Sequence, residues 1–331
     1  MKILITGVSG FLAHALAERL LEQGYAVLGV ARSAPRHAGI PYATLDLTDF
    51  SSTLALLERE LPEQIFHLAA VSVLQHAGGP EGARGMLEAN VAGTWNLLEA
   101  SRRLEIPQVV VASSDKQYGA LAVPPYDDED STAFANGGLY ELSKAQQDQV
   151  ARLYAGLYET PAIRVARLAN VYGPGDLHWS RIVPGTIRRT VEGVAPRITA
   201  GKAGESLREY VFLDDALAGL LALAADAQSR GNAPLQRIDG KLARVAFNIG
   251  SPHRHAAASV IQTVQQVLAE DFGIVGPPPE VQPGVVGVFE PGSQFNRLER
   301  LRELMPHYSP RSLHEGLRLT IPWYLEQLRQ G

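Results

Sequence analysis

Short aliphatic, β-branched runs alternate with longer amphipathic segments through the first half of the chain. The short runs predict strands at Lys2–Thr6, Ala26–Val30, Gln64–Leu68, Gln108–Ala112 and Ala162–Arg167. The longer segments predict helices at Phe11–Glu22, Thr53–Glu60, Met86–Leu104 and Leu139–Tyr158. Strands separated by helix-length segments indicate βαβ units and a parallel sheet with helices on both faces. We therefore expect an α/β, doubly wound fold whose ligands bind at the carboxyl ends of the strands.

The pattern becomes less regular after Asn170, where prolines and glycines interrupt it. Only Asp215–Asp226 and Ala256–Glu270 have the spacing of clear helices there, and Val245–Ile249 predicts a strand that returns to the main sheet. The run Gly276–Pro279 predicts a stiff connector. We expect residues 1–169 to form a nucleotide-binding domain, with residues 170–331 forming mainly a smaller, interleaved substrate-binding portion.

Composition and charge exclude several classes of function. Of the 331 residues, 46% are hydrophobic and 20% are charged, as in globular proteins with a substantial core. The net charge of -5 supplies no basic field to hold nucleic acid or an anionic membrane. The chain has no cysteine, which excludes disulfides and thiolate zinc sites. No signal-peptide pattern, membrane-spanning run or metal-binding histidine and carboxylate cluster is found, so we expect a cytoplasmic protein without a metal.

A glycine-rich turn, Gly7-Val8-Ser9-Gly10-Phe11-Leu12-Ala13, follows the first predicted strand. A turn of this kind lets the backbone approach a diphosphate and directs helix N–H groups toward it. Its position at the first βα junction favours this interpretation over a plain tight turn. The dinucleotide-binding candidates in the turn are Gly7, Ser9, Gly10, Phe11 and Leu12.

The end of the second predicted strand bears on the type of dinucleotide. Enzymes that use NAD usually carry an acid there, which binds the ribose 2′-hydroxyl, but this chain has Ala31-Arg32-Ser33. The guanidinium of Arg32 suits a 2′-phosphate and Ser33 adds a hydroxyl, so the pattern favours NADP, with NAD as the alternative. Asp46 and Leu47, which lie between the predicted strands Ala26–Val30 and Gln64–Leu68, are candidates for the adenine pocket. Asp46 could equally be a helix-capping acid.

Two further motifs make the family resemblance specific. Tyr140-Glu141-Leu142-Ser143-Lys144 is a Tyr-x-x-x-Lys motif, and Ser113-Ser114-Asp115-Lys116 ends an earlier strand. With the glycine-rich turn, they resemble the extended short-chain dehydrogenase/reductases (NAD-dependent epimerases and dehydratases), which have a Rossmann-like fold. The resemblance covers nearly the whole chain, through His67–Ala70, Asn90–Thr94, Arg167–Gly175, Arg208–Val211, Asp214–Ala216 and Pro322–Tyr324. It implies that Leu68, Ala69, Ala70, Tyr140 and Lys144 contact the dinucleotide.

The spacing of Tyr140 and Lys144 has a chemical meaning of its own. Residues four apart on a helix share a face, and a nearby ammonium favours the phenolate of a tyrosine, whose ordinary pKa is near 10. We therefore expect Lys144 to lower the pKa of Tyr140 so that it can act as a base. The resemblance implies that Lys144 also holds the nicotinamide ribose and that Ser114 binds the same substrate hydroxyl as Tyr140.

The pair Asp115-Lys116 distinguishes reactions within this family. Nucleotide-sugar 4,6-dehydratases place an acid and a second proton-transfer residue directly after the serine or threonine, and those resembling CDP-glucose 4,6-dehydratase have Asp-Lys. Water elimination across C5–C6 needs one group to take the C5 proton and another to protonate the departing hydroxyl. Lys116 as base and Asp115 as acid would meet this need, whereas the alternative is an ordinary ion pair in a turn. Two departures are Arg32 and Arg208-Glu209-Tyr210, of which the latter is more similar to epimerases.

The resemblance also implies substrate contacts and an assembly. Asn170 is expected to contact the substrate and Arg208 its diphosphate, and Arg181 is either a further phosphate ligand or a solvated loop charge. For His67 we favour a packing role over a catalytic one. Family members commonly pair through the Tyr-x-x-x-Lys helix and its neighbour, so we expect a homodimer. The apolar faces proposed for that contact contain Leu97, Leu98, Val150, Leu153 and Leu157.

These features predict an enzyme that acts on a nucleotide-diphosphate sugar. The leading hypothesis is a 4,6-dehydratase, a lyase that oxidises C4, eliminates water across C5–C6 and returns the hydride to C6. The alternatives are a C4 epimerase and an NADPH-dependent C4 keto-sugar reductase. A dinucleotide-sensing regulatory protein is the alternative outside the enzymes, although a sensor has no need of the Ser114, Tyr140 and Lys144 set.

Overall fold

A parallel sheet forms the centre of the molecule. The computed structural model describes residues 1–35, 39–71, 82–119, 124–128, 138–199, 205–232, 244–282 and 292–330. Within them the sheet has seven strands in the order β10-β6-β5-β4-β1-β2-β3. These are β10 (Ala246–Ile249), β6 (Ala162–Leu168), β5 (Gln108–Ser114), β4 (Gln64–His67), β1 (Lys2–Thr6), β2 (Ala26–Ala31) and β3 (Tyr42–Thr44). The strand order reverses between β1 and β4, so the fold is the expected Rossmann-like one, with a ligand crevice at that point.

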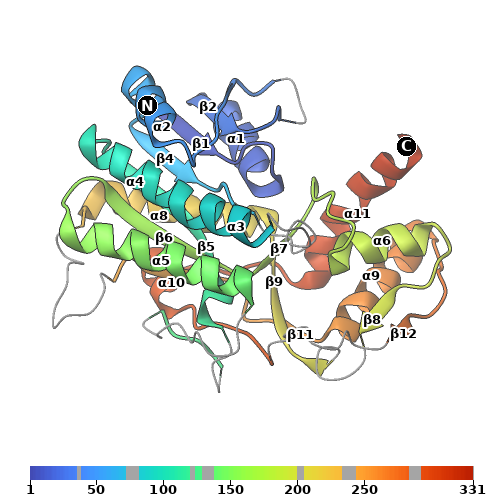
Figure 1. The fold of residues 1–331 in the computed structure, drawn as a ribbon. Helices are drawn as coiled ribbons and strands as arrows, with labels where there is room; N and C mark the ends of the chain where they lie inside the picture. Colours follow the sequence, from blue (N-terminus) through green and yellow to red (C-terminus); the bar gives the residue numbers. More distant parts are fainter. Residues whose placement is uncertain are drawn as a thin grey trace.

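Helices cover both faces of the sheet (Figure 1). One core packs α2 (Phe50–Glu60), α4 (Gly93–Arg103) and α5 (Leu139–Leu157) against the strands. On the other face the core contains α1 (Phe11–Glu22), α8 (Leu213–Arg230) and α10 (Glu299–Leu304). Helix α8 and strand β10 therefore belong to the layers around the sheet although they lie far along the chain. The two halves of the sequence are interleaved.

Two buried arginines on β6 hold helices on opposite faces of the sheet. Arg164 Nε donates to Asp226 Oδ2 of α8 at 2.5 Å. Arg167 pairs through Nε and Nη2 with both carboxylate oxygens of Asp148 on α5, each at 2.8 Å. Both arginine side chains are fully buried. Because the two residues are three apart on a strand, their side chains leave opposite faces and tie each helix layer to the same strand.

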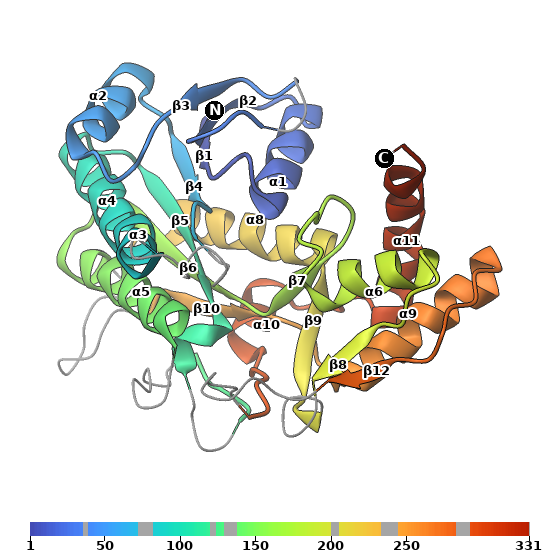
Figure 2. The same cartoon turned by 45° about the vertical axis from the view of Figure 1, so that its right-hand side comes forward.

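A smaller lobe stands beside the carboxyl ends of the strands (Figure 2). Its core joins α6 (Ile182–Val191), α9 (Ala257–Phe272) and α11 (Leu313–Gln330). A three-stranded sheet of β11 (Arg254–His255), β9 (Arg208–Phe212) and β7 (Asn170–Tyr172) connects the lobe to the main body. Strands β8 (Arg197–Thr199) and β12 (Glu280–Gln282) form a separate pair.

The expectation of only two clear helices after Asn170 was wrong, because α6 and α11 are long helices. Each of these two helices contains a proline, which made the sequence pattern there look non-helical. Pro184 lies in the first turn of α6. The residue four positions before it lies outside the helix, so an N–H at this position would have no helical carbonyl to bond, and the proline loses no hydrogen bond there. Pro322 lies inside α11, and the packing of buried Leu317, Ile321 and Tyr324 keeps that helix together around it.

The segment expected to be one helix, Met86–Leu104, is divided into three parts. It contains α3 (Gly82–Leu87), a π-helical turn η2 (Glu88–Ala92) and α4. The amide of buried Asn90 in this turn exchanges two hydrogen bonds with the backbone of Val71 and donates to Ser143 Oγ at 2.9 Å. A π turn adds a residue to the helical repeat and so changes which side chains face inward. Here it directs Asn90 toward α5.

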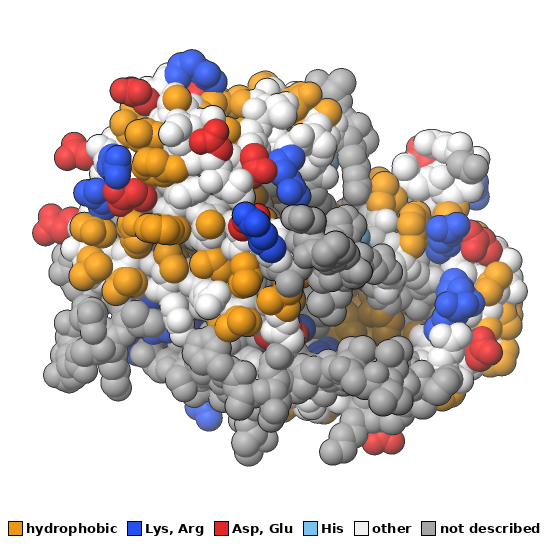
Figure 3. All heavy atoms as spheres, viewed as in Figure 1, with side chains coloured by type: hydrophobic (Ala, Val, Ile, Leu, Met, Phe, Trp, Pro, Cys, Tyr) orange, Lys and Arg blue, Asp and Glu red, His pale blue; other side chains and the backbone are white. Residues whose placement is uncertain are grey.

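Exposed apolar side chains gather over α4 and α5, at mid-height on the left of Figure 3. They include Trp95, Leu153 and Leu157, which are 56%, 39% and 54% exposed. Leu97 and Leu98, which were expected on an exposed apolar face, are instead fully buried in the core. Among the described residues, no helix combines the length and apolar character that a membrane span requires.

Candidate active site

Two adjoining cavities open at the switch point of the sheet. The larger, about 520 Å³, lies between the carboxyl ends of the strands and the smaller lobe, and the other, about 200 Å³, extends to the end of β2. They share lining residues from the β1–α1 turn and from the end of β4, so they form one continuous groove. Apart from Arg208, every sequence-predicted site residue lines one or both of them. The larger is lined by Gly7, Gly10, Phe11, Leu12, Leu68, Ala70, Ser114, Asp115, Lys116, Tyr140, Lys144, Asn170 and Arg181, and the smaller by Gly7, Ser9, Gly10, Arg32, Ser33, Asp46, Leu47, Leu68, Ala69 and Ala70.

The turn between β1 and α1 is shaped for a diphosphate. Gly7 has a φ of 78°, and a Cβ there would lie 2.7 Å from Ala69 Cα, so only glycine fits against the end of β4. Gly10 is the N-cap of α1 without a side-chain cap, and the first turn of the helix has no acid. The N–H groups at this helix end therefore face the groove without a competing carboxylate.

The smaller cavity fits the adenosine end of a dinucleotide. The side chains of Arg32 and Ser33 line it at the end of β2, and Asp46 and Leu47 line it after β3. The carboxylate of Asp46 accepts the backbone N–H of Thr48 at 3.0 Å. Further lining residues not singled out from the sequence are Val30, Ala31, Leu45, Thr48, Val71 and Ala89. The groove thus runs from Arg32 past the glycine turn to Tyr140, as an extended dinucleotide requires.

Tyr140 and Ser114 meet at the floor of the larger cavity. Ser114 ends β5, Tyr140 lies in the first turn of α5, and the two side chains are hydrogen bonded. Burial raises the pKa of Tyr140 to about 12, while the bond to Ser114 and the charge of Arg181 act in the opposite direction. The expected lowering of this pKa by Lys144 is not found, because desolvation of the phenolate outweighs every favourable contribution.

Lys144 is buried and held by two acceptors. Its Nζ donates to the carbonyl oxygen of Ala112 at 3.0 Å and to Gln147 Oε1 at 2.7 Å. Burial lowers the pKa of Lys144 to about 7, whereas the charge of Asp148 raises it. The ammonium and the neutral amine are therefore both accessible near neutral pH.

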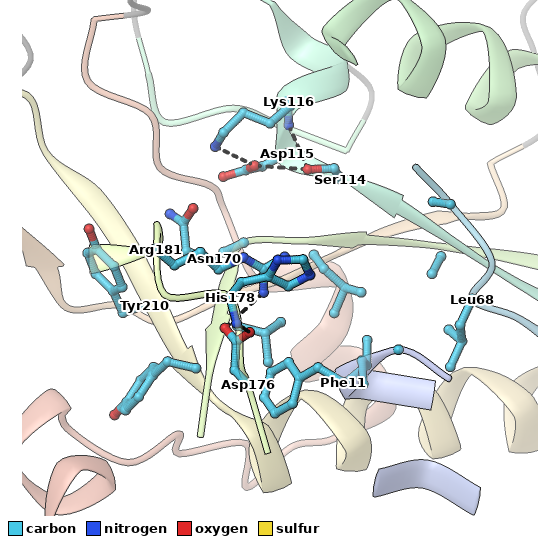
Figure 4. A pocket seen from close by; sticks show the side chains of 18 of the residues that line it. Phe11, Leu68, Ser114, Asp115, Lys116, Asn170, Asp176, His178, Arg181 and Tyr210 are labelled. Atoms are coloured by element: carbon cyan, nitrogen blue, oxygen red, sulfur yellow. Dashed lines mark hydrogen bonds and ion pairs between the residues drawn. The ribbon is translucent and has the colours of Figure 1, made fainter. Parts of the chain in front are cut away.

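Asp115 and Lys116 form an ion pair on the cavity wall (Figure 4). They begin the 3₁₀ turn η3 (Asp115–Tyr118) directly after β5, and Lys116 Nζ lies 2.8 Å from Asp115 Oδ1. The Oγ of Ser114 also donates to Asp115 Oδ1, at 3.3 Å. Asp115 is 1% exposed, and its Oδ2 has no hydrogen-bond partner among the described residues. This carboxylate is thus adjacent to the Ser114 and Tyr140 pair.

The loop after β7 supplies the remaining wall of the larger cavity. Arg181 Nη1 pairs with buried Asp176 Oδ2 at 2.9 Å, and Asn170 Nδ2 donates to the carbonyl of Glu209 at 2.9 Å. Asp176, His178 and Tyr210 also line the cavity, although sequence reasoning gave them no role. The family resemblance of Arg167–Gly175, directly before Asp176, was the signal that could have identified the first two.

Arg208 is the one predicted site residue outside the described cavity linings. Its Nη1 donates to the carbonyl oxygens of Leu207 and Gly292, at 3.0 and 2.6 Å. Arg208 and Tyr210 lie two apart on β9, so their side chains point to the same side of the strand, and of these two residues Tyr210 lines the cavity. The structure therefore brings Arg181, not Arg208, together with Tyr140.

His67 is a buried, hydrogen-bonded residue at the end of β4. Its Nδ1 and Nε2 each lie 2.8 Å from a hydroxyl, that of Thr6 and that of Thr94. Burial lowers its pKa to about 3, so the ring stays neutral. This arrangement agrees with the packing role favoured from the sequence. No group of three metal-ligating side chains occurs in the described part of the chain.

Comparisons with known proteins identify the family of the chain. Residues 3–250 match the model of the "NAD dependent epimerase/dehydratase family". UDP-glucose 4-epimerase of Mycolicibacterium smegmatis is 28% identical, with 98% of each chain covered. dTDP-glucose 4,6-dehydratase 1 of Escherichia coli is 24% identical, covering 99% of this chain and 94% of that one. In fold, the chain is similar to UDP-glucose 4-epimerase of Thermotoga maritima, with a TM-score of 0.81 at 24% identity over 99% and 100% of the two chains. Because the family model matches well over half of the chain, this protein belongs to the NAD dependent epimerase/dehydratase family.

Proposed function

We propose that this protein is a nucleotide-sugar 4,6-dehydratase. The observation that carries the proposal is the Asp115–Lys116 ion pair, which lies in the larger cavity beside the Ser114 and Tyr140 pair. Oxidation at C4 needs only a base and a hydrogen-bond partner for the C4 hydroxyl. A second acid–base pair next to them matches the elimination that distinguishes a dehydratase.

In the first step Tyr140 takes the proton of the C4 hydroxyl, and Ser114 donates a hydrogen bond to the same oxygen. The dinucleotide, when bound along the groove, supplies the hydride acceptor at C4 and the hydride donor at C6. Tyr140 must approach its phenolate form for this step. Arg181 and the bond to Ser114 both favour that form.

The elimination requires a neutral base and a protonated acid. The Lys116 ammonium and Asp115 carboxylate become such a pair when one proton passes along their 2.8 Å contact. Lys116 then removes the C5 proton of the 4-keto sugar, Asp115 protonates the C6 hydroxyl, and water leaves with formation of the C5–C6 double bond. Addition of hydride at C6 and of a proton at C5 completes the 4-keto-6-deoxy product.

A nucleotide-sugar 4-epimerase is the second candidate. It is favoured by the similarity to UDP-glucose 4-epimerase, the higher of the two identities given above. In that reaction Ser114 and Tyr140 suffice, and the 4-keto sugar rotates to accept the hydride on its other face. Asp115 and Lys116 would then be a structural ion pair.

We also propose a preference for NADP over NAD within this NAD-dependent family. The support is the basic side chain of Arg32 with the hydroxyl of Ser33 on the wall of the smaller cavity. No carboxylate follows β2 at the place where one would bind a ribose 2′-hydroxyl. A homodimer formed through α4 and α5 is the proposed assembly.

Incubation with a panel of nucleotide-diphosphate sugars, followed by mass measurement, tests the reaction. Loss of one water supports the dehydratase, whereas an isomer of unchanged mass identifies an epimerase. A gain of two hydrogens identifies a reductase. Dinucleotide binding without any product would identify a sensor.

Replacing Lys116 by Met separates the two halves of the proposed reaction. Met keeps much of the side chain's bulk and removes the group that takes the C5 proton. We expect oxidation at C4 to persist in a single turnover, with a rise in absorbance of reduced nicotinamide and no dehydrated product. Normal steady-state turnover of Lys116→Met would reject the dehydratase in favour of the epimerase.

A further inference from the structure

Behind Lys144 lies a chain of buried polar side chains that the proposed reaction does not use. Gln147 Nε2 donates to Thr94 Oγ1 at 2.8 Å, and the same oxygen lies 2.8 Å from His67 Nε2. His67 Nδ1 lies 2.8 Å from Thr6 Oγ1, which also accepts the backbone N–H groups of Leu68 and Ala69. The side chains of Thr6, His67, Thr94 and Gln147 are all fully buried. This series of hydrogen bonds therefore connects Lys144 to the backbone at the end of β4.

Counting donors and acceptors leaves one arrangement of protons in this chain. Thr94 donates its single hydroxyl proton to the carbonyl of Asn90, at 2.7 Å, so it must accept from both Gln147 and His67. His67 is then protonated on Nε2, and its Nδ1 accepts the hydroxyl proton of Thr6. The single polar hydrogens of Thr94, His67 and Thr6 are then each used once.

This arrangement determines which way the amide of Gln147 faces. Its nitrogen must point to Thr94, because that hydroxyl has only acceptor capacity left. Its oxygen therefore points to Lys144 and accepts from Nζ at 2.7 Å. With the bond to Ala112 at 3.0 Å, two of the three N–H groups of the ammonium are held in fixed directions. The third remains for the cavity that Lys144 lines.

We propose that Gln147, itself oriented by Thr94 and His67, is a positioning residue for Lys144. It fixes the direction in which the Lys144 ammonium points toward the bound dinucleotide. A free lysine side chain has four flexible bonds, and two fixed acceptors remove most of that freedom before the dinucleotide binds. The inference rests on the proposed function in one respect, that Lys144 contacts the bound dinucleotide during C4 oxidation, and it does not depend on whether dehydration follows.

Replacing Gln147 by Met tests the inference, with Gln146→Met as the matched control. Gln146 is a half-buried neighbour on the same helix and lies outside this hydrogen-bond chain. Isothermal calorimetry with NAD and with NADP is the first readout. Loss of a hydrogen bond to a charged group predicts that Gln147→Met weakens dinucleotide affinity about tenfold, while Gln146→Met stays close to wild type. Equal affinities for the two variants would overturn the inference.

Coupling to Lys144 distinguishes positioning from a purely structural role. If Gln147 acts through Lys144, Gln147→Met weakens affinity no further in a Lys144→Met background, even if it lowers thermal stability in both. The same loss in both backgrounds would show that Gln147 does not act through Lys144. Unchanged affinity of Lys144→Met alone would instead contradict the role of Lys144 in the proposed function.

Gln147→Glu provides a second variant that preserves side-chain size. It keeps an acceptor beside Lys144 and loses the donor toward Thr94. We expect it to recover part of the affinity that Gln147→Met loses. A Glu variant that binds dinucleotide no better than the Met variant counts against the acceptor role and overturns the inference.

Discussion

The proposed preference for NADP rests mainly on the side chain of Arg32. Arg32 directly follows β2 and lines the smaller cavity, where the 2′ position of an adenine ribose is expected. We predict that Arg32→Ala weakens NADP binding by about 1.5–3 kcal/mol, as for a lost charge-assisted contact, and leaves NAD binding nearly unchanged. Calorimetric titration with the two dinucleotides measures both values. An equal loss for both, or tighter binding of NAD by the unmodified protein, would reject the proposed preference.

Because His67 is buried in its neutral form, it makes the folded protein less stable as the pH falls. In the folded protein its pKa is lowered to about 3, whereas the unfolded chain takes up a proton near pH 6.5. The stability due to His67 is complete above about pH 7 and is lost as the pH falls through 6.5 toward 3. At pH 5.5 the loss is about 1.4 kcal/mol relative to pH 7.5.

The His67→Gln variant isolates this contribution. Glu209 and Asp128, whose pKa values burial raises to about 7 and about 6, act in the opposite direction but are common to both proteins. The free energy of unfolding in urea, measured at pH 7.5 and 5.5, should therefore fall less in His67→Gln than in wild type, by about 1.4 kcal/mol. Identical pH dependence in the two proteins would contradict a neutral, buried His67.

At the scale of elements, the sheet holds its helices partly through ion pairs. The Arg164–Asp226 contact joins β6 to α8, with side chains 0% and 4% exposed. We predict that Asp226→Asn destabilises the fold by about 3–5 kcal/mol, because it leaves the Arg164 charge buried without its counter-ion. Urea unfolding at neutral pH measures the change.

An exposed ion pair serves as the control for this prediction. Arg188 on α6 and Glu192, the C-cap of that helix, lie one turn apart, and their side chains are 44% and 43% exposed. Glu192→Gln should change the free energy of unfolding by at most about 0.5 kcal/mol, since solvent screens such a pair. Similar costs for Asp226→Asn and Glu192→Gln would show that burial of Arg164 is not the source of the effect.

At the scale of the whole molecule, the apolar surface over α4 and α5 predicts self-association. Trp95, Leu153 and Leu157 are exposed there, and isologous packing of these helices would bury all three in a four-helix contact. We expect light scattering at micromolar concentration to give the mass of a dimer. Leu157→Glu should shift the protein to a monomer because it places a charge in the contact. Leu319→Glu, at a leucine 52% exposed on α11, is the matched control and should remain dimeric.

A monomeric wild-type protein would contradict this assembly. If Leu157→Glu stays dimeric, the dimer contact lies on another face of the molecule. Leu97 and Leu98 can be left out of the test, because both are buried in the core and unavailable to a partner.

Local pattern predicted most strands and helices of the first half of the fold and the two motifs that line the groove. The strands and helices from Lys2 to Leu168 have apolar spacings that only a covered parallel sheet satisfies. The glycine turn and the Tyr-x-x-x-Lys motif lie within a few residues of chain, so their identity needs no tertiary information. The sequence also placed Ser114 at a strand end, where the edge of a parallel sheet brings it to the ligand crevice.

Only the tertiary structure decided which side chains are buried and toward which neighbours they point. Whether Leu97 faces the core or a partner, and whether Arg208 or Arg181 reaches the cavity, depends on which elements pack against each one. The pKa of Tyr140 rises because neighbouring elements exclude water from its hydroxyl, an effect that the spacing to Lys144 does not reveal. Gln147 acquires its orientation from Thr94 and His67, which lie 53 and 80 residues away in the chain. Periodicity records what one segment can form, whereas solvation and hydrogen-bond partners depend on residues brought together by folding.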